Sequence, residues 1–263
     1  RMKIAMVASE AAPFVKTGGL GDVLQALPQA LSEIKNNEVS VFIPFYDRIK
    51  YSGKYDVEFL GYFDVPLAWR REYVGLLRLK SRRKKLKIYF IDNEHYFCRG
   101  CVYGCADDGE RYAYFAKATL ASMAFIGLQP DVVHCHGWFS SIVPVYLRNL
   151  FADDPIFKKV KIVVSLYDDA FEGELDKKFK AKIQGEGVPK KYLDYLDDPT
   201  YENLMKFVIN YADGVIFETP EPAAPIVDFL HEKKKPFLEF QDKTTAEYLD
   251  HYQAFYNKIL ANE

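Results

Sequence analysis

A repeated alternation of short apolar runs with stretches of helical spacing constrains the fold of this chain more than any other feature. The apolar runs are five or six residues long and fall at 3–7, 39–44, 131–135, 161–166 and 214–218. Between them, helical spacing of apolar residues predicts helices at 22–34, 111–126, 140–150 and 201–211. Apolar strands that alternate with helices form parallel sheets with helices on both faces. The sequence therefore predicts an α/β fold with a single Rossmann-like, doubly wound, mostly parallel sheet.

The sequence pattern differs in one region, between positions 55 and 91. The segments 72–79 and 86–91 alternate polar and apolar residues, and the basic stretch 81–85 separates them. Alternation of this kind, split by a turn, is typical of two paired antiparallel strands. We expect a hairpin inserted into the sheet. The wider basic run 82–87 is either a solvated turn or a binding surface for an anionic partner.

The last part of the chain also departs from the alternation of strands and helices. Prolines cluster at 220–225, the run 233–236 reads Lys-Lys-Lys-Pro, and 245–260 then has the apolar stripe of a terminal helix. We expect a domain over residues 2–230 and a tail over 231–263 whose helix packs on the same domain. A well-formed terminal helix also favours a naturally short chain over a truncated one.

Composition excludes several classes of protein. The chain has 263 residues, of which 49% are hydrophobic and 16% aromatic, so a sizeable core is expected and disorder is not. Its 35 basic and 37 acidic side chains give a net charge of -2, which predicts neither nucleic-acid nor membrane binding. No apolar run is long enough to span a membrane. Four cysteines do not suggest a disulfide scaffold, and we expect a soluble cytoplasmic protein.

A glycine-rich loop follows the first predicted strand and reads Lys-Thr-Gly-Gly-Leu-Gly-Asp at 16–22. Asp22 stands at a suitable N-cap position for the helix that follows. Glycines let a ligand approach the backbone, and the free N–H groups of a helix N-terminus attract anions. The loop is neither a Walker loop nor a dinucleotide fingerprint. Anion binding and a plain tight turn both remain open from the residues alone.

Residues 3–24, which include this loop, closely resemble the start of bacterial glycogen synthases and plant starch synthases. The likeness continues in segments that resemble later signatures of that family, at 91–97, 103–104, 130–138, 143–147 and 211–215. The resemblance covers most of residues 2–220. It implies the N-terminal half of a two-domain, GT-B-type glycosyltransferase. The family reaction is retaining transfer of glucose from ADP-glucose or UDP-glucose to the non-reducing end of an α-1,4-glucan such as glycogen, without metal or cofactor.

The resemblance also implies roles for individual residues. Those on the side of the donor phosphates are Lys16, Thr17, Gly18, Gly19 and Gly21. Those on the side of the sugar or glucan are His136 and Trp138. Asp168 and Asp169 are further sugar-side candidates because they follow Tyr167, which stands in the place of the family's histidine, and could partly substitute for it, although neither is a neutral imidazole. His134 is expected to be a core residue, whereas His136 is expected to line the pocket.

The chain departs from the family in three respects. Full-length members are about twice as long, and the half that supplies most of the nucleotide pocket is absent. Gly137 stands where the family has an acidic residue, and Tyr167 stands where it has the active-site histidine of Ile-His-Asn. No catalytic residue is therefore assigned, and we expect the isolated chain to be inactive. A separately encoded C-terminal half could complete it; the alternatives are a non-catalytic relative that binds glucan or nucleotide sugar, or a partner subunit of an authentic synthase.

A metal site is the competing interpretation of the cysteines. Cys98, Cys101 and Cys105 are closely spaced, and Cys135 and His136 follow later in the chain. The spacing matches no standard zinc or iron–sulfur pattern, and the resemblance implies no metal. We expect no metal site.

Overall fold

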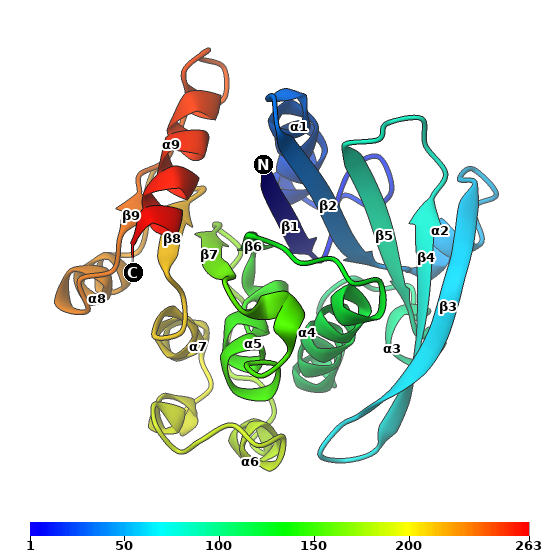
Figure 1. Ribbon diagram of the computed structural model, residues 1–263. Coiled ribbons are helices and arrows are strands. Elements are labelled where there is room, and N and C mark those ends of the chain that lie inside the picture. Colours follow the sequence, from blue (N-terminus) through cyan, green and yellow to red (C-terminus); the bar gives the residue numbers. More distant parts are fainter. Residues whose placement is uncertain (263) are drawn as a thin grey trace.

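The computed structural model describes residues 1–262, and these form one nine-stranded sheet in the order β3-β4-β5-β2-β1-β6-β7-β8-β9 (Figure 1). The strands are β1 (Met2–Ala8), β2 (Asn37–Pro44), β3 (Val57–Pro66), β4 (Arg71–Leu79), β5 (Leu86–Asp92), β6 (Val132–His136), β7 (Lys161–Leu166), β8 (Gly214–Phe217) and β9 (Phe237–Leu238). All neighbours from β5 to β9 pair in parallel, whereas β4 pairs antiparallel with both β3 and β5.

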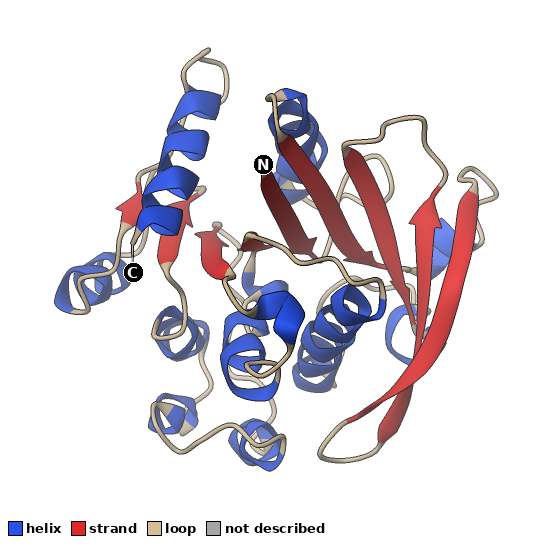
Figure 2. Cartoon of the chain, in the orientation of Figure 1, coloured by secondary structure: helices blue, strands red, loops and turns tan. Residues whose placement is uncertain are grey.

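Helices cover both faces of this sheet (Figure 2). The α-helices are α1 (Gly19–Glu33), α2 (Asp47–Lys50), α3 (Glu94–Phe97), α4 (Asp108–Phe125), α5 (Val143–Leu150), α6 (Phe179–Gly185), α7 (Tyr201–Ile209), α8 (Ala224–Glu232) and α9 (Tyr248–Ala261). Short 3₁₀ turns are η1 (Trp138–Ser140), η2 (Pro155–Phe157) and η3 (Leu193–Leu196). In Figure 1, α1 and α9 lie on one side of the sheet, and α4, α5 and α7 lie on the other.

The predicted doubly wound sheet is confirmed, with β1 inside it between β2 and β6. Strand β1 is almost wholly buried because both of its faces are covered by helices, which explains its continuous apolar run. The predicted hairpin is also confirmed as β4 and β5, with the basic turn between them. The sequence did not indicate β3, which extends the sheet by one further antiparallel strand with a register shift between Phe59 and Gly61.

Two expectations from the sequence were wrong. Helix α1 begins at Gly19 with Gly18 as its N-cap, so Asp22 lies inside the first turn and is not the cap. The proline-rich segment is not a simple break, because α8 starts there with Pro225 in its first turn, a position where the missing N–H of proline costs nothing. Strand β9 follows α8 and pairs in parallel with β8.

The terminal helix α9 packs on the domain. Its buried face consists of Tyr252, Phe255, Tyr256 and Ile259. Phe255 and Ile259 press so closely on β8 that a Cβ atom at Gly214 would lie within 3 Å of both side chains. This helix therefore belongs to the same core as the sheet.

Candidate functional site

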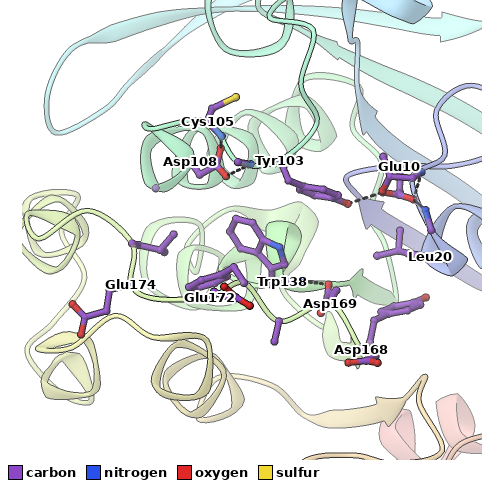
Figure 3. A pocket seen from close by; sticks show the side chains of 18 of the residues that line it. Glu10, Leu20, Tyr103, Cys105, Asp108, Trp138, Asp168, Asp169, Glu172 and Glu174 are labelled. Atoms are coloured by element: carbon purple, nitrogen blue, oxygen red, sulfur yellow. Dashed lines mark hydrogen bonds between the residues drawn. The ribbon is translucent and has the colours of Figure 1, made fainter.

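A cavity of about 670 Å³ opens at the carboxyl ends of the central strands (Figure 3). Its walls come from the loop after β1, the N-terminus of α1, the turn after β6 and the loop after β7. The chain winds from β1 toward β2 in one direction and returns to place β6 on the other side of β1. Ligands of open α/β sheets bind at such a switch point, outside the carboxyl ends of the strands.

The glycine-rich loop wraps around a buried carboxylate, that of Glu10. Glu10 Oε1 accepts the N–H groups of Thr17 at 3.0 Å and Gly18 at 3.2 Å. Its Oε2 accepts the Thr17 hydroxyl at 2.6 Å and the Tyr103 hydroxyl at 2.8 Å (Figure 3). Two of the backbone donors that the sequence suggested for phosphate are thus already bound to an internal anion. The donors that remain at this end of the helix are the N–H groups of Gly19 and Leu20, which have no intrahelical carbonyl to bond.

Glycine stands at the three positions of the loop for different physical reasons. A Cβ atom at Gly18 or Gly19 would meet nothing within 4 Å, so packing within this chain does not require glycine there. Both positions line the cavity, which leaves room for a ligand against the backbone. A Cβ atom at Gly21 would instead lie 3.0–3.1 Å from Lys16 carbons and Glu10 Oε1, so that glycine serves packing.

The Lys16 side chain does not line the cavity in this structure, although a contact with a donor phosphate is expected of it. Its ammonium lies 2.9 Å from Asp22 Oδ2, both side chains are about half exposed, and Lys16 is not among the lining residues. Its contact with a donor phosphate, like that of Thr17 and the three glycines, stays a prediction.

The turn after β6 meets the loop after β7 at Gly137, Trp138 and Asp169. Gly137 has φ +80° and ψ 169°, a region that essentially only glycine occupies. The Trp138 N–H donates to Asp169 Oδ2 at 3.0 Å, and the Tyr201 hydroxyl lies 3.4 Å from Asp169 Oδ1. Burial raises the pKa of Asp169 to about 6, although its hydrogen bonds with Trp138 and Tyr201 oppose the shift. Trp138 and Asp169 line the cavity, together with the exposed Asp168, and their role on the sugar side stays a prediction.

Behind this wall lies a buried polar network. The Tyr167 hydroxyl pairs with His136 Nδ1 at 2.8 Å, and the His136 and His134 rings stack at 3.9 Å. His134 pairs with the Tyr256 hydroxyl of α9 and with Ser165, both at 2.6 Å. Burial lowers the pKa of His134 to about 3 and holds that of His136 well below its usual value, so both rings are neutral.

His134 is in the core, as the sequence indicated. His136 is also fully buried and does not line the cavity, which differs from the expected placement. Its Nε2 atom has no hydrogen-bond partner within residues 1–262. Tyr167, at the position of the family's histidine, does line the cavity, but its hydroxyl is turned inward to His136.

Glu218 completes the far wall and ties the terminal helix to the site. Its carboxylate is 1% exposed, accepts the Tyr252 hydroxyl of α9, and forms an ion pair with Lys243 at 2.6 Å. The tail of the chain therefore supports the cavity wall from behind, through the contacts of Lys243 and Tyr252 with Glu218.

The cavity is strongly acidic. Within the described range, its lining includes no Lys, Arg or His side chain, whereas it includes the carboxylates of Glu10, Asp108, Asp168, Asp169, Glu172, Glu174, Asp176 and Glu218. Asp108, Asp176 and Glu218 have ion-pair partners behind the wall, namely Arg111, Lys182 and Lys243. Carboxylates that face a cavity accept hydrogen bonds from hydroxyl groups and repel anions. This half of a site thus suits a polyhydroxylated neutral ligand better than a phosphate.

The cysteines are not arranged as the competing metal hypothesis requires. Cys101 and Cys105 form a disulfide, which the cysteine count had not suggested, and Cys98 and the buried Cys135 are free. In residues 1–262, no group of three or more His, Cys, Asp or Glu side chains is arranged to hold a metal ion. Over the same range, none of the helices is both long and apolar enough to cross a bilayer.

The fold matches that of the N-terminal half of GT-B-type glycosyltransferases, and the cavity lies at the carboxyl ends of its strands. The sequence profile described as starch synthase catalytic domain matches residues 3–230, and the chain belongs to this family. The glycogen synthases of Streptococcus equi subsp. zooepidemicus and Streptococcus mutans serotype c are 39% and 40% identical over 226 residues. Each match covers 86% of this chain and 47% of the relative, so the chain spans about half the length of these curated relatives.

A solved structure supports the same fold. The catalytic domain of starch synthase IV from Arabidopsis thaliana, bound to ADP and acarbose, superposes with a TM-score of 0.73 at 22% identity. The match covers 92% of this chain and 51% of that one. The family resemblance noted from the motifs is confirmed by the profile match and by the two glycogen synthases.

Three residues of the site escaped the sequence analysis: Glu10, Tyr103 and Glu218. Each is polar and lies just after a strand or in a loop. Each is held in the site by hydrogen bonds to another segment of the chain. A signal existed for Glu10, which is an acidic residue directly after a buried strand and ahead of the glycine-rich loop.

Proposed function

We propose that this chain is the sugar-binding half of a glycogen- or starch-synthase-type glucosyltransferase. The reaction is retaining transfer of glucose from ADP-glucose or UDP-glucose to the non-reducing end of an α-1,4-glucan, with no metal or cofactor. A second polypeptide segment, the counterpart of the half of the curated relatives that this chain does not span, completes the site. We place the reaction in the cytoplasm.

One observation carries the proposal: the acidic cavity at the switch point, floored by Gly18 and Gly19 with open space above their backbone. Hydroxyl-rich ligands are held by carboxylates and backbone groups of this kind. The departing nucleoside diphosphate gains negative charge in the transition state and needs cationic or N–H donors. On this side the N–H groups of Gly19 and Leu20 are the nearest such donors, Lys16 is the predicted cation, and the other cations come from the second half.

The isolated chain should transfer almost no glucose. A retaining transfer requires donor and acceptor to be held together in a closed cleft from which water is excluded. One half leaves the cavity open on its outer side, and its carboxylates repel the donor diphosphate. Nucleotide-sugar binding by this half alone should be about millimolar, or about -4 kcal/mol.

The test compares the chain alone with a fusion to the part of the Streptococcus mutans glycogen synthase that lies beyond the matched region. Incorporation of labelled glucose from ADP-glucose and UDP-glucose into glycogen is measured for both, with the streptococcal segment alone as the control. The fusion should transfer glucose, and neither part should do so separately. Robust transfer by this chain alone, or a folded fusion that remains inactive with both donors, would contradict the proposal.

A glucan-binding relative without transferase activity is the second candidate. The observation that favours it is the inward-turned Tyr167, which leaves no imidazole on the wall of the cavity within residues 1–262. An inactive fusion that still binds maltohexaose would select this candidate. Tyr167→His in the fusion then tests whether the missing imidazole is the cause.

A further inference from the structure

The crossing between the turn after β6 and the loop after β7 has an unusual construction. At Gly137 the backbone adopts φ +80° and ψ 169°, which side chains disfavour. A Cβ atom there would also lie 2.5 Å from Leu20 Cδ1 and 3.0 Å from Asp169 Oδ2. Position 137 therefore cannot present a side chain to the cavity, and the space beside it belongs to Asp169.

The Asp169 carboxylate is held in place yet keeps acceptor capacity. Its Oδ2 receives the Trp138 N–H at 3.0 Å (Figure 3), while the Tyr201 hydroxyl approaches Oδ1 at the longer distance of 3.4 Å. Within the described residues it forms no ion pair, and it lines the cavity. Two carboxylate oxygens offer about four lone-pair positions, so sites remain for a ligand.

We propose that Asp169 binds a hydroxyl group of a neutral sugar in the cavity, and that Gly137 is glycine in order to admit this carboxylate from the loop after β7. The inference rests on the proposed function and names the ligand class of this wall. It assigns to the loop after β7 the acidic group that a side chain at position 137 cannot supply.

The surroundings of Asp169 favour a hydroxyl over a phosphate. The groups that face it are the Trp138 N–H from η1, the Tyr201 hydroxyl from α7, the apolar Leu20 from α1 and the acidic Asp168 on its own loop. None of these is a cation that could offset the repulsion between a phosphate and the carboxylate. A sugar hydroxyl donates to a carboxylate without that penalty, and a hydrogen bond to the ionised form is about twice as strong as one to a neutral acceptor.

The sign of the pH dependence distinguishes the two ligands. Because burial raises the pKa of Asp169 to about 6, the group is mostly protonated at pH 5 and mostly ionised at pH 7.5. A hydroxyl ligand should bind more tightly as pH rises through 6. An anion beside the same carboxylate should bind more weakly over that interval.

The experiment follows Trp138 fluorescence in a Trp69→Phe background, where Trp138 is the remaining tryptophan. Maltohexaose is titrated at pH 5 and pH 7.5, and ADP is titrated as the anionic probe. The expected maltohexaose Kd is about fivefold lower at pH 7.5. Asp169→Asn, which keeps an oxygen for the Trp138 N–H, should weaken binding at pH 7.5 by about fivefold and remove the pH dependence. Asp153→Asn, an exposed carboxylate in a distant loop, is the matched control and should change neither.

Three results would overturn the inference. Maltohexaose affinity that is the same at both pH values and in Asp169→Asn would show that the carboxylate does not contact the sugar. Tighter ADP binding at pH 5 with no maltohexaose binding would place an anion there instead. No maltohexaose binding at any concentration up to the solubility limit would remove the ligand itself. The proposed function fails separately, through an inactive fusion, so the two failures are distinguishable.

Discussion

The two ends of the same parallel strands have opposite characters. At the carboxyl ends, the acidic cavity holds carboxylates that are buried and hydrogen-bonded, as Glu10 and Glu218 are. At the amino ends, a second cavity of about 530 Å³ is lined by cations, and among them Lys84, Lys85 and Lys87 are exposed and form no ion pair within residues 1–262. These three lysines belong to the basic run noted in the sequence, and no contact of the described chain explains their charge.

This contrast shows that the number of charges in a cavity says little about how much each one matters. A buried carboxylate with several donors is positioned by the fold, and its removal leaves those donors without partners. A solvated lysine interacts chiefly with water, which screens it. Substitutions at the carboxyl ends should therefore change stability by kilocalories per mole, and comparable substitutions at the amino ends should not.

The largest effect is expected at the crossing beside Asp169. Gly137→Ala must strain a backbone conformation that only glycine adopts readily and must also displace Leu20 and Asp169. Backbone strain of about 1–3 kcal/mol and overpacking of about 1–3 kcal/mol together predict a loss of about 3 kcal/mol or more in the free energy of unfolding. Urea denaturation measures it.

Gly173→Ala is the matched control for this substitution. Gly173 also has a positive φ, of +70°, but a Cβ atom there would meet nothing within 4 Å. Only the backbone penalty of about 1–2 kcal/mol should remain. Equal losses for the two variants would show that the space beside Gly137 is not in fact filled.

The next effect concerns the anion inside the glycine-rich loop. Glu10→Gln keeps one acceptor but points an amide at the hydroxyl donors of Thr17 and Tyr103. Loss of charge-assisted bonds to a buried group predicts about 2 kcal/mol lower stability. The exposed Glu232→Gln should change stability by less than about 0.5 kcal/mol. If both variants were equally stable, the loop would not depend on its internal carboxylate.

The sequence predicted the central strands of the sheet well, but it predicted the start of α1 and the helix α8 less well. Strands such as β1 are buried on both faces, and this burial appears directly as a continuous apolar run. The start of α1 was missed because three glycines are poor helix formers, while the bonds of Glu10 that fix the loop come from tertiary folding. Helix α8 was missed because Pro225 was interpreted as a break, although proline fits the first turn of a helix.

The candidate site was predicted only in part for a related reason. Motif resemblance located Gly18 and Trp138, and the departure from the motif at Tyr167 drew attention to Asp169; these three residues line one cavity. The inward turn of Tyr167 and the burial of His136 depend on the register of β6 against β7, in which His136 lies beside Ser165. A pattern along one chain does not contain that register, so the contacts across the two strands required the structure.

A smaller effect is expected behind the cavity, where α9 meets the sheet. Tyr256→Phe removes the hydroxyl that pairs with His134 Nδ1 at 2.6 Å in a fully buried site. An unsatisfied buried polar atom costs about 1–3 kcal/mol, and we expect a loss near 1.5 kcal/mol. Tyr248→Phe, on the half-buried part of the same helix, should be nearly neutral. A neutral Tyr256→Phe would mean that the carboxyl-end network is less coupled to α9 than its geometry indicates.

The smallest effect is expected at the amino ends and completes the comparison. Lys84→Gln, Lys85→Gln and Lys87→Gln together remove three charges from the basic cavity, which is as many charges as the ion-paired carboxylates that line the acidic one. Because these side chains are exposed, the triple variant should change the free energy of unfolding by less than about 0.5 kcal/mol. Mutual repulsion among them should be relieved by salt, so any gain in stability at low ionic strength should vanish near 0.5 M NaCl. A loss of more than about 1 kcal/mol at either ionic strength would break the contrast, because it would show that these lysines, like Glu10, are held by the fold.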